Sequence, residues 1–174
     1  MPASSPTAIL ETERLRLREL GEMDAPFILR LLNEPSFIKN IVDKKVRTIK
    51  QACNYINSGP ITSYRENGFG LYLVELKEEN IPIGMCGLVK RKGLDYPDIG
   101  YALLPEHWSK GYAVESASAL LNYAQKVLEL EQIVGITNPE NEGSARVLEK
   151  IGLKYERMIQ VTKDMPETKY YVSK

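Results

Sequence analysis

A predicted strand-to-helix junction near the middle of the chain carries residue types suited to binding a phosphate group. The stretch Leu103–Ala113 runs from a predicted strand directly into a long predicted helix. The first N–H groups of a helix have no partner within the helix, and the helix dipole favours negative charge there. Gly111 and Ala113 let a ligand approach the main chain closely, and Lys110 adds a positive charge. The junction therefore predicts a pyrophosphate site, although it matches neither Gly-x-Gly-x-x-Gly nor Walker A.

The side chains available for catalysis are limited, because the sequence contains one histidine and two cysteines. Any Ser-His-Asp or Cys-His mechanism would have to use His107, which we expect to be a loop residue. Cys53 and Cys86 cannot form a disulfide framework, and with one histidine they cannot build a Cys/His zinc site. We therefore predict no metal, and chemistry that depends on the backbone, hydroxyls and carboxylates.

Length and composition predict one ordinary globular domain. The chain has 174 residues, of which 43% are apolar and 26% charged, with 23 basic and 23 acidic residues. The balanced charge argues against a nucleic-acid-binding protein, and no apolar run is long enough to span a membrane. The start lacks the pattern of a secretory signal. We expect a cytoplasmic protein with a disordered tail over residues 1–8 and a single domain over residues 9–174.

Hydrophobic periodicity predicts helices early in the chain, strands in the middle and a β-α-β unit near the end. Strands are predicted over residues 13–19, 69–76, 83–89, 98–104, 132–137, 153–162 and 169–173. Helices are predicted over residues 24–34, 37–42, 48 to about 58–60, 113–128 and 141–151. This order predicts an α/β (α+β) fold with a central mixed, mostly antiparallel sheet flanked by helices.

A second motif, Asn138–Leu153, follows the junction further along the chain. Together the two motifs resemble the GNAT superfamily of acyl-CoA-dependent N-acetyltransferases. The early stretch Glu11–Arg18 is similar to the branch that includes ribosomal-protein N-terminal acetyltransferases. The resemblance covers roughly residues 11–158. It implies a GNAT fold, with a sheet that is splayed at the cofactor site, and acetyl-CoA as the acyl donor.

The resemblance also implies which residues hold acetyl-CoA. The backbone contacts to its pyrophosphate fall on Ser109, Lys110, Gly111, Tyr112, Ala113 and Val114. The pantetheine arm is expected to bond to the backbone at Ala102, Leu103 and Leu104, and to the side-chain amide of Asn141. The family's Gln or Arg position holds Trp108, which we expect to anchor the loop rather than to contact the ligand.

Two catalytic roles follow from the resemblance, an acid and a base. Ser144 shares a helix face with Asn141 and is implied to lie near the thioester sulfur, where it could protonate the departing thiolate. A base helps because the attacking amine must be neutral. Some family members carry a Glu base in the strand before the Asn motif, but this sequence has Gly135 there. The alternatives are Glu106, Asp98, the phenol of Tyr101, or a water held by such groups.

Simpler structural roles compete with these assignments. Asn141 and Ser144 are also typical of a helix start, and Glu115 suits a hydrogen bond or the helix dipole. Both cysteines suit the core. The basic trio Lys90–Lys92 predicts a strand end in solvent, with contact to the 3′-phosphate of the cofactor or to an acidic substrate as the alternative.

We predict direct transfer of an acetyl group from acetyl-CoA to a primary amine, without an acyl-enzyme. The acceptor is either a protein N-terminal α-amine or a small-molecule amine. The expected partners are acetyl-CoA and this acceptor, without nucleic acid or membrane, and the protein is a monomer or a homodimer. The alternatives are an acyl-CoA-binding sensor that has lost catalysis and a thiol enzyme that uses Cys53 or Cys86 with His107.

Overall fold

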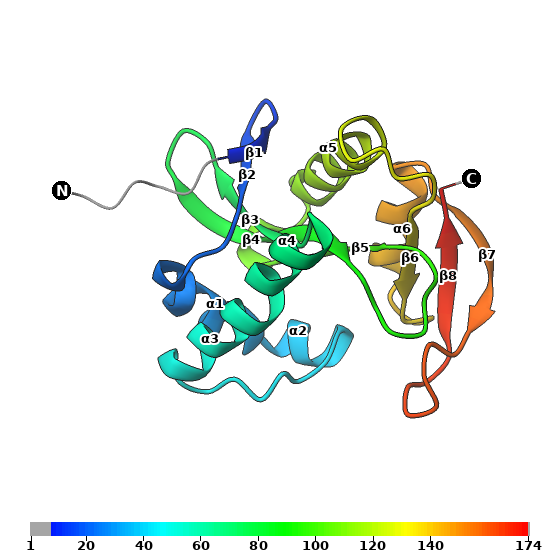
Figure 1. The fold of residues 1–174 in the computed structure, drawn as a ribbon, viewed down its shortest axis with the longest axis horizontal. Helices are drawn as coiled ribbons and strands as arrows, with labels where there is room; N and C mark the ends of the chain where they lie inside the picture. The colour runs from blue at the N-terminus through cyan, green and yellow to red at the C-terminus, as the bar shows by residue number, and fades with distance from the viewer. Residues whose placement is uncertain (1–7, 174) are drawn as a thin grey trace.

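One mixed sheet forms the centre of the computed structural model, which describes residues 8–173 (Figure 1). Its strands lie in the order β1-β2-β3-β4-β5-β6-β8-β7. They are β1 (Ala8–Glu11), β2 (Leu15–Arg18), β3 (Leu71–Leu76), β4 (Ile81–Val89), β5 (Asp98–Leu103), β6 (Val134–Thr137), β7 (Lys154–Ile159) and β8 (Thr168–Val172). Neighbouring strands are antiparallel except for β5 and β6. The predicted mixed, mostly antiparallel sheet is confirmed.

Residues 1–7 of the predicted disordered tail lie outside the described residues. Ala8, the last residue of that predicted tail, begins strand β1. Strand β1 is not predictable from the sequence, because it has four residues and lacks the strict alternation seen in β2. It pairs antiparallel with β2 and so extends the sheet at one edge.

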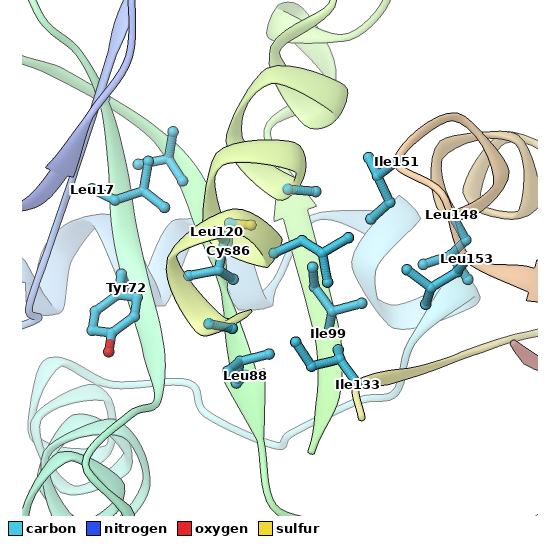
Figure 2. Packing of buried hydrophobic residues seen from close by; sticks show 14 of the residues in the cluster. Leu17, Tyr72, Cys86, Leu88, Ile99, Leu120, Ile133, Leu148, Ile151 and Leu153 are labelled. Atoms are coloured by element: carbon cyan, nitrogen blue, oxygen red, sulfur yellow. The ribbon is translucent and has the colours of Figure 1, made fainter. Parts of the chain in front are cut away.

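Helices cover both faces of the sheet (Figure 1). They are α1 (Ala25–Leu32), α2 (Pro35–Asn40), α3 (Ile49–Ile56), α4 (Thr62–Asn67), α5 (Tyr112–Lys126) and α6 (Glu142–Lys150). Side chains alternate between the two faces along each strand. On β3, Tyr72 therefore packs in the cluster with α5 and α6, which Figure 2 shows, and Leu73 packs in the cluster with α1 and α3.

The prediction that the third helix stops near residues 58–60 is wrong. One π-helical turn, Asn57–Ile61, joins α3 directly to α4, and the helical run ends only at Gly68, which has φ +78°. The wider turn accommodates Pro60, which is buried. The Thr62 hydroxyl donates to the Asn57 carbonyl at 2.7 Å. Gly59 and Pro60 therefore lie where the helical pitch changes. Local sequence rules predict that a helix ends at such a Gly-Pro pair.

Strands β5 and β6 are paired at one point only. Asp98 faces Val134, and the Val134 N–H donates to the Pro97 carbonyl at 2.9 Å. Beyond this pair, the described residues of β5 and β6 do not pair with each other. Strand β6 instead pairs antiparallel with β8 along its length. The two parallel strands therefore separate toward their carboxyl ends and leave a gap, which confirms the splayed sheet.

Candidate functional site

The gap between β5 and β6 exposes backbone groups of every second residue of β5. The Leu104 N–H donates to the Ile83 carbonyl of β4 at 2.9 Å. Because backbone direction alternates along a strand, Ala102 also faces β4, whereas Tyr101 and Leu103 face the gap. The Leu104 carbonyl is engaged as well, since it accepts from the His107 N–H at 2.9 Å. Of the three backbone positions predicted to contact pantetheine, Leu103 therefore faces the gap, whereas Ala102 and Leu104 face β4; Tyr101, which was not among them, also faces the gap.

The predicted phosphate loop follows β5 and contains two residues with a left-handed backbone. Ser109 has φ +61° and Gly111 φ +83°, and α5 starts at the next residue. A left-handed residue beside a right-handed one brings successive N–H groups to the same side of the chain, an arrangement that can bind anions. The first helical hydrogen bond joins the Glu115 N–H to the Gly111 carbonyl at 3.0 Å. The three N–H groups of residues 112–114 therefore have no acceptor within the helix.

Trp108 anchors this loop, as predicted. Its indole Nε1 donates to the carbonyl of Leu103 at 2.9 Å, across the short helical turn Pro105–His107. The Leu103 carbonyl faces the gap. In a closed sheet it would accept a hydrogen bond from β6, whereas here it accepts one from the indole. The bond ties the phosphate loop to the end of β5.

The turn between β1 and β2 holds the first turn of α5 in place. Only one of the residues in this contact, Glu115, was predicted to form a hydrogen bond. The Glu115 carboxylate accepts from the Thr12 hydroxyl at 2.5 Å, from the Arg14 N–H at 3.1 Å and from Arg14 Nε at 2.8 Å. The prediction that Glu115 is a hydrogen-bond partner is confirmed. No signal in the sequence indicated Thr12 and Arg14, because they lie about one hundred residues earlier.

Asn141 caps α6, as the simpler of its two roles predicts. Its Oδ1 accepts from the Ser144 N–H at 3.1 Å. This bond uses the carbonyl end of the side-chain amide only, so Nδ2 keeps two donors for a ligand. Asn141 also lines a cavity of about 190 Å³ between the end of α2 and the loop before α6, together with Lys39, Asn40, Asn138 and Glu140.

The side chains of Tyr101 on β5 and Ser144 on α6 are neighbours. Burial raises the pKa of the Tyr101 phenol, and a hydrogen bond with Ser144 opposes this shift. A phenol with a raised pKa keeps its proton at neutral pH, so it donates hydrogen bonds rather than accepting protons. The structure therefore disfavours Tyr101 as the base and joins it to Ser144 as a pair of hydroxyl donors.

The two carboxylates considered as bases lie in different environments. Glu106 is more than half exposed and pairs with Arg30 of α1. Asp98 is 1% exposed and lies where β5 and β6 separate. Its Oδ2 accepts from Arg91 Nε at 2.7 Å, whereas Oδ1 is buried with no hydrogen-bond partner among the described residues. Burial raises the pKa of Asp98 to about 6, although Arg91 opposes the shift.

The position where some family members carry a Glu has no room for a side chain here. A Cβ on Gly135 would lie 2.8 Å from Leu148 Cδ2 and 3.3 Å from Leu153 Cδ2. Both leucines are buried in the cluster with α5 and α6. A side chain at Gly135 would therefore require Leu148 and Leu153 to shift.

The remaining sequence candidates have structural roles. Cys86 is buried, and burial raises the pKa of its thiol to about 12, so the thiolate needed by a thiol enzyme does not form at neutral pH. Cys53 is half-buried against the cluster with α1 and α3. Lys90 and Lys92 are exposed, as predicted, but Arg91 between them is half-buried and pairs with Asp98.

Two kinds of feature are absent from the described part of the chain. Residues 8–173 contain no cluster of three or more His, Cys, Asp or Glu side chains able to hold a metal ion. Within the same residues no helix has the length and apolar character needed to cross a membrane.

Comparison with known proteins gives a consistent result. Residues 14–154 match the model of the Acetyltransferase (GNAT) domain. The chain is 31% identical to the uncharacterized protein YkkB of Bacillus subtilis over 159 residues, which cover 87% of this chain and 88% of YkkB. An acetyltransferase from Agrobacterium tumefaciens superposes with a TM-score of 0.81 at 26% identity, covering 99% of this chain and 96% of that one.

The fold also resembles that of RimL, a ribosomal L7/L12 α-N-protein acetyltransferase solved in complex with coenzyme A. The TM-score is 0.82 at 17% identity, and the match covers 95% of this chain and 97% of that one.

Proposed function

Because the chain belongs to the GNAT acetyltransferase family, we propose that it moves the acetyl group of acetyl-CoA to a primary amine by direct attack. The acceptor is a protein N-terminal α-amine or a small-molecule amine. The observation that carries the proposal is the order of groups along β5. From its carboxyl end backward lie the phosphate loop, the gap-facing backbone of Leu103 and Tyr101, the Tyr101–Ser144 pair and the buried carboxylate of Asp98.

This order matches an extended ligand with an anionic end and a reactive end. The N–H groups of residues 109–114 and the Lys110 ammonium suit a pyrophosphate. The backbone of Leu103 and Tyr101 and the Nδ2 of Asn141 suit the amide groups of a pantetheine arm. Acetyl-CoA supplies an activated acetyl thioester, and the residues of the chain supply its orientation.

The proton transfers are assigned to two groups on either side of the reacting centre. Ser144 donates a proton to the departing thiolate and regains one from the neighbouring Tyr101 phenol, which solvent reprotonates once CoA has left. Asp98 accepts the proton of the amine through a water, because a carboxylate with a pKa of about 6 is ionised at neutral pH and basic enough to act. An α-amine, with a pKa of about 8, needs this help less than an alkyl amine does.

Removing either hydroxyl of the donor pair should slow turnover while leaving cofactor affinity unchanged. We expect Ser144→Ala and Tyr101→Phe each to lower kcat about tenfold, less than the usual contribution of a general acid because the thiolate of CoA is already a fair leaving group. The double variant should be little worse than either one, because the two side chains act as a unit. Steady-state kinetics and calorimetric titration with CoA measure both effects. Tyr123→Phe, which also removes a half-buried phenol, is the control; unchanged kcat in Ser144→Ala would contradict the role.

Asn141→Asp separates the capping role of Asn141 from ligand binding. The aspartate keeps an oxygen for the Ser144 N–H but removes the Nδ2 donor. We expect KM for acetyl-CoA to rise about fivefold, the loss of about one hydrogen bond, with no drop in Tm. Asn141→Ala should raise KM similarly and also lower stability by about 1 kcal/mol through loss of the cap. A KM for Asn141→Asp equal to that of the native protein would limit Asn141 to capping.

One experiment tests the proposal and its main alternative. The protein is mixed with acetyl-CoA and a panel of amines, and free thiol is followed over time. The panel contains peptides with a free N-terminus, peptides with only lysine amines, a polyamine and small amino compounds. Thiol release that depends on one amine class supports the transferase and identifies its acceptor. Calorimetric binding of acetyl-CoA without thiol release from any amine supports the acyl-CoA sensor instead.

The oligomeric state and the cytoplasmic location stay predictions. Light scattering distinguishes the monomer from the homodimer.

A further inference from the structure

Arg14 lies beside the proposed phosphate loop, although it precedes Lys110 of that loop by 96 residues in the sequence. Its guanidinium stacks over the ring of Tyr112, with Cζ 4.4 Å from the ring centroid. Nε donates to Glu115 at 2.8 Å, and Nη1 donates to the Lys110 carbonyl at 3.0 Å. The side chain therefore contacts both sides of Gly111, the residue that starts α5.

The third nitrogen of this guanidinium is placed differently from the other two. Nη2 makes no hydrogen bond with residues 8–173 and lies 3.3 Å from the point that a Cβ on Gly111 would occupy. The absent side chain of Gly111 leaves open the space beside the unpaired N–H groups of residues 112–114. Nη2 therefore borders the same space as those N–H groups.

We infer that Arg14 is a cofactor-binding residue whose Nη2 donates a hydrogen bond to the pyrophosphate of CoA. A guanidinium suits this role because it stays charged and forms directed bonds to phosphate oxygens. The contacts to Glu115, Lys110 and Tyr112 fix the group before any ligand arrives, which lowers the entropic cost of binding. The Glu115 carboxylate offsets the positive charge of the Arg14 guanidinium, and the exposed Lys110 ammonium keeps the loop positively charged.

The inference rests on the proposed use of acetyl-CoA, and binding experiments test it apart from turnover. Three probes are titrated into the protein, namely CoA, inorganic pyrophosphate and pantetheine, which lacks phosphate groups. We expect Arg14→Gln to weaken the binding of CoA and of pyrophosphate by a similar factor, about tenfold, because one charge-assisted hydrogen bond is lost. Pantetheine affinity should stay within about twofold of the native value, because no phosphate is involved.

Two further variants separate a ligand contact from support of the loop. Arg16→Gln is the matched control, since Arg16 lies two residues after Arg14, on β2, but pairs with Glu11 and Glu75, away from α5. It should leave all three affinities unchanged. Arg14→Lys keeps the charge and should recover part of the CoA affinity.

The salt dependence of CoA binding is a further test. It should be shallower in Arg14→Gln than in the native protein.

Several results would overturn the inference. One is unchanged CoA affinity in Arg14→Gln, and another is an equal loss for CoA and pantetheine, which would make Arg14 a support of the loop alone. If the native protein itself fails to bind CoA, the proposed function fails instead, so the two failures are distinguishable. Tm values of both glutamine variants check that each is folded at the titration temperature.

Discussion

Gly111→Glu is expected to abolish measurable binding of acetyl-CoA. The new carboxylate would lie in the space beside the free N–H groups of α5, where the pyrophosphate is proposed to bind. It would also compete for the Arg14 guanidinium, since a Cβ at this position is 3.3 Å from Nη2. Repulsion between the carboxylate and a phosphate, added to lost volume, should raise Kd by about a hundredfold or more. Calorimetric titration with acetyl-CoA measures the loss.

Backbone strain must be separated from the loss of the phosphate site. Gly111 has φ +83°, which side chains adopt with difficulty, so any substitution there lowers stability. Gly152→Glu is the matched control, because Gly152 has φ +105°, is exposed and has no atom within 4 Å of its Cβ position. The control should lose stability but keep acetyl-CoA affinity. Gly111→Glu with native affinity would refute the assignment of the loop.

Asp98→Asn is expected to lower kcat about a hundredfold, the usual contribution of a general base. Asn has nearly the same shape and keeps an oxygen for Arg91 Nε, so the buried contact remains. A base works only in its ionised form, and the pKa of Asp98 is raised to about 6 by burial. The rate of the native protein should therefore rise with pH through about pH 6 and then level off. The variant should lack this rise.

Glu106→Gln is the control for the second prediction, because Glu106 was the other carboxylate considered as the base. Its side chain is exposed and pairs with Arg30, so we expect kcat within about twofold of the native value. A large loss in Glu106→Gln with full activity in Asp98→Asn would reverse the assignment. Rates measured with an α-amine and with an alkyl amine should both show the effect, more strongly for the alkyl amine.

Much of the fold was predictable because its signals are local. The long helix α5 and the paired strands β3 and β4 follow from periodicity within each segment. The loop proposed to bind phosphate could be located for the same reason, since a strand, a glycine and a helix start occur within eleven residues, Leu103–Ala113. The turn at Gly59 and Pro60 was misread, because the same two residues suit a helix stop and a π-helical turn.

The groups proposed to be catalytic were less predictable because their properties depend on distant neighbours. Asp98 and Glu106 are equivalent carboxylates in the sequence, and only burial beside Arg91 distinguishes the first. Tyr101 was a candidate base until its burial and its contact with Ser144, which comes 43 residues later in the sequence, indicated a donor.

The sequence by itself therefore determined the mixed sheet, the position of the loop proposed to bind phosphate and the resemblance to GNAT acetyltransferases. These depend on patterns that short segments carry and that each segment keeps wherever it packs. Only the tertiary structure decided which backbone groups of β5 face the gap, which carboxylate is buried, and that Arg14 reaches Gly111. Strand register, desolvation and contacts between segments about one hundred residues apart arise from packing of the whole chain, so no local pattern encodes them.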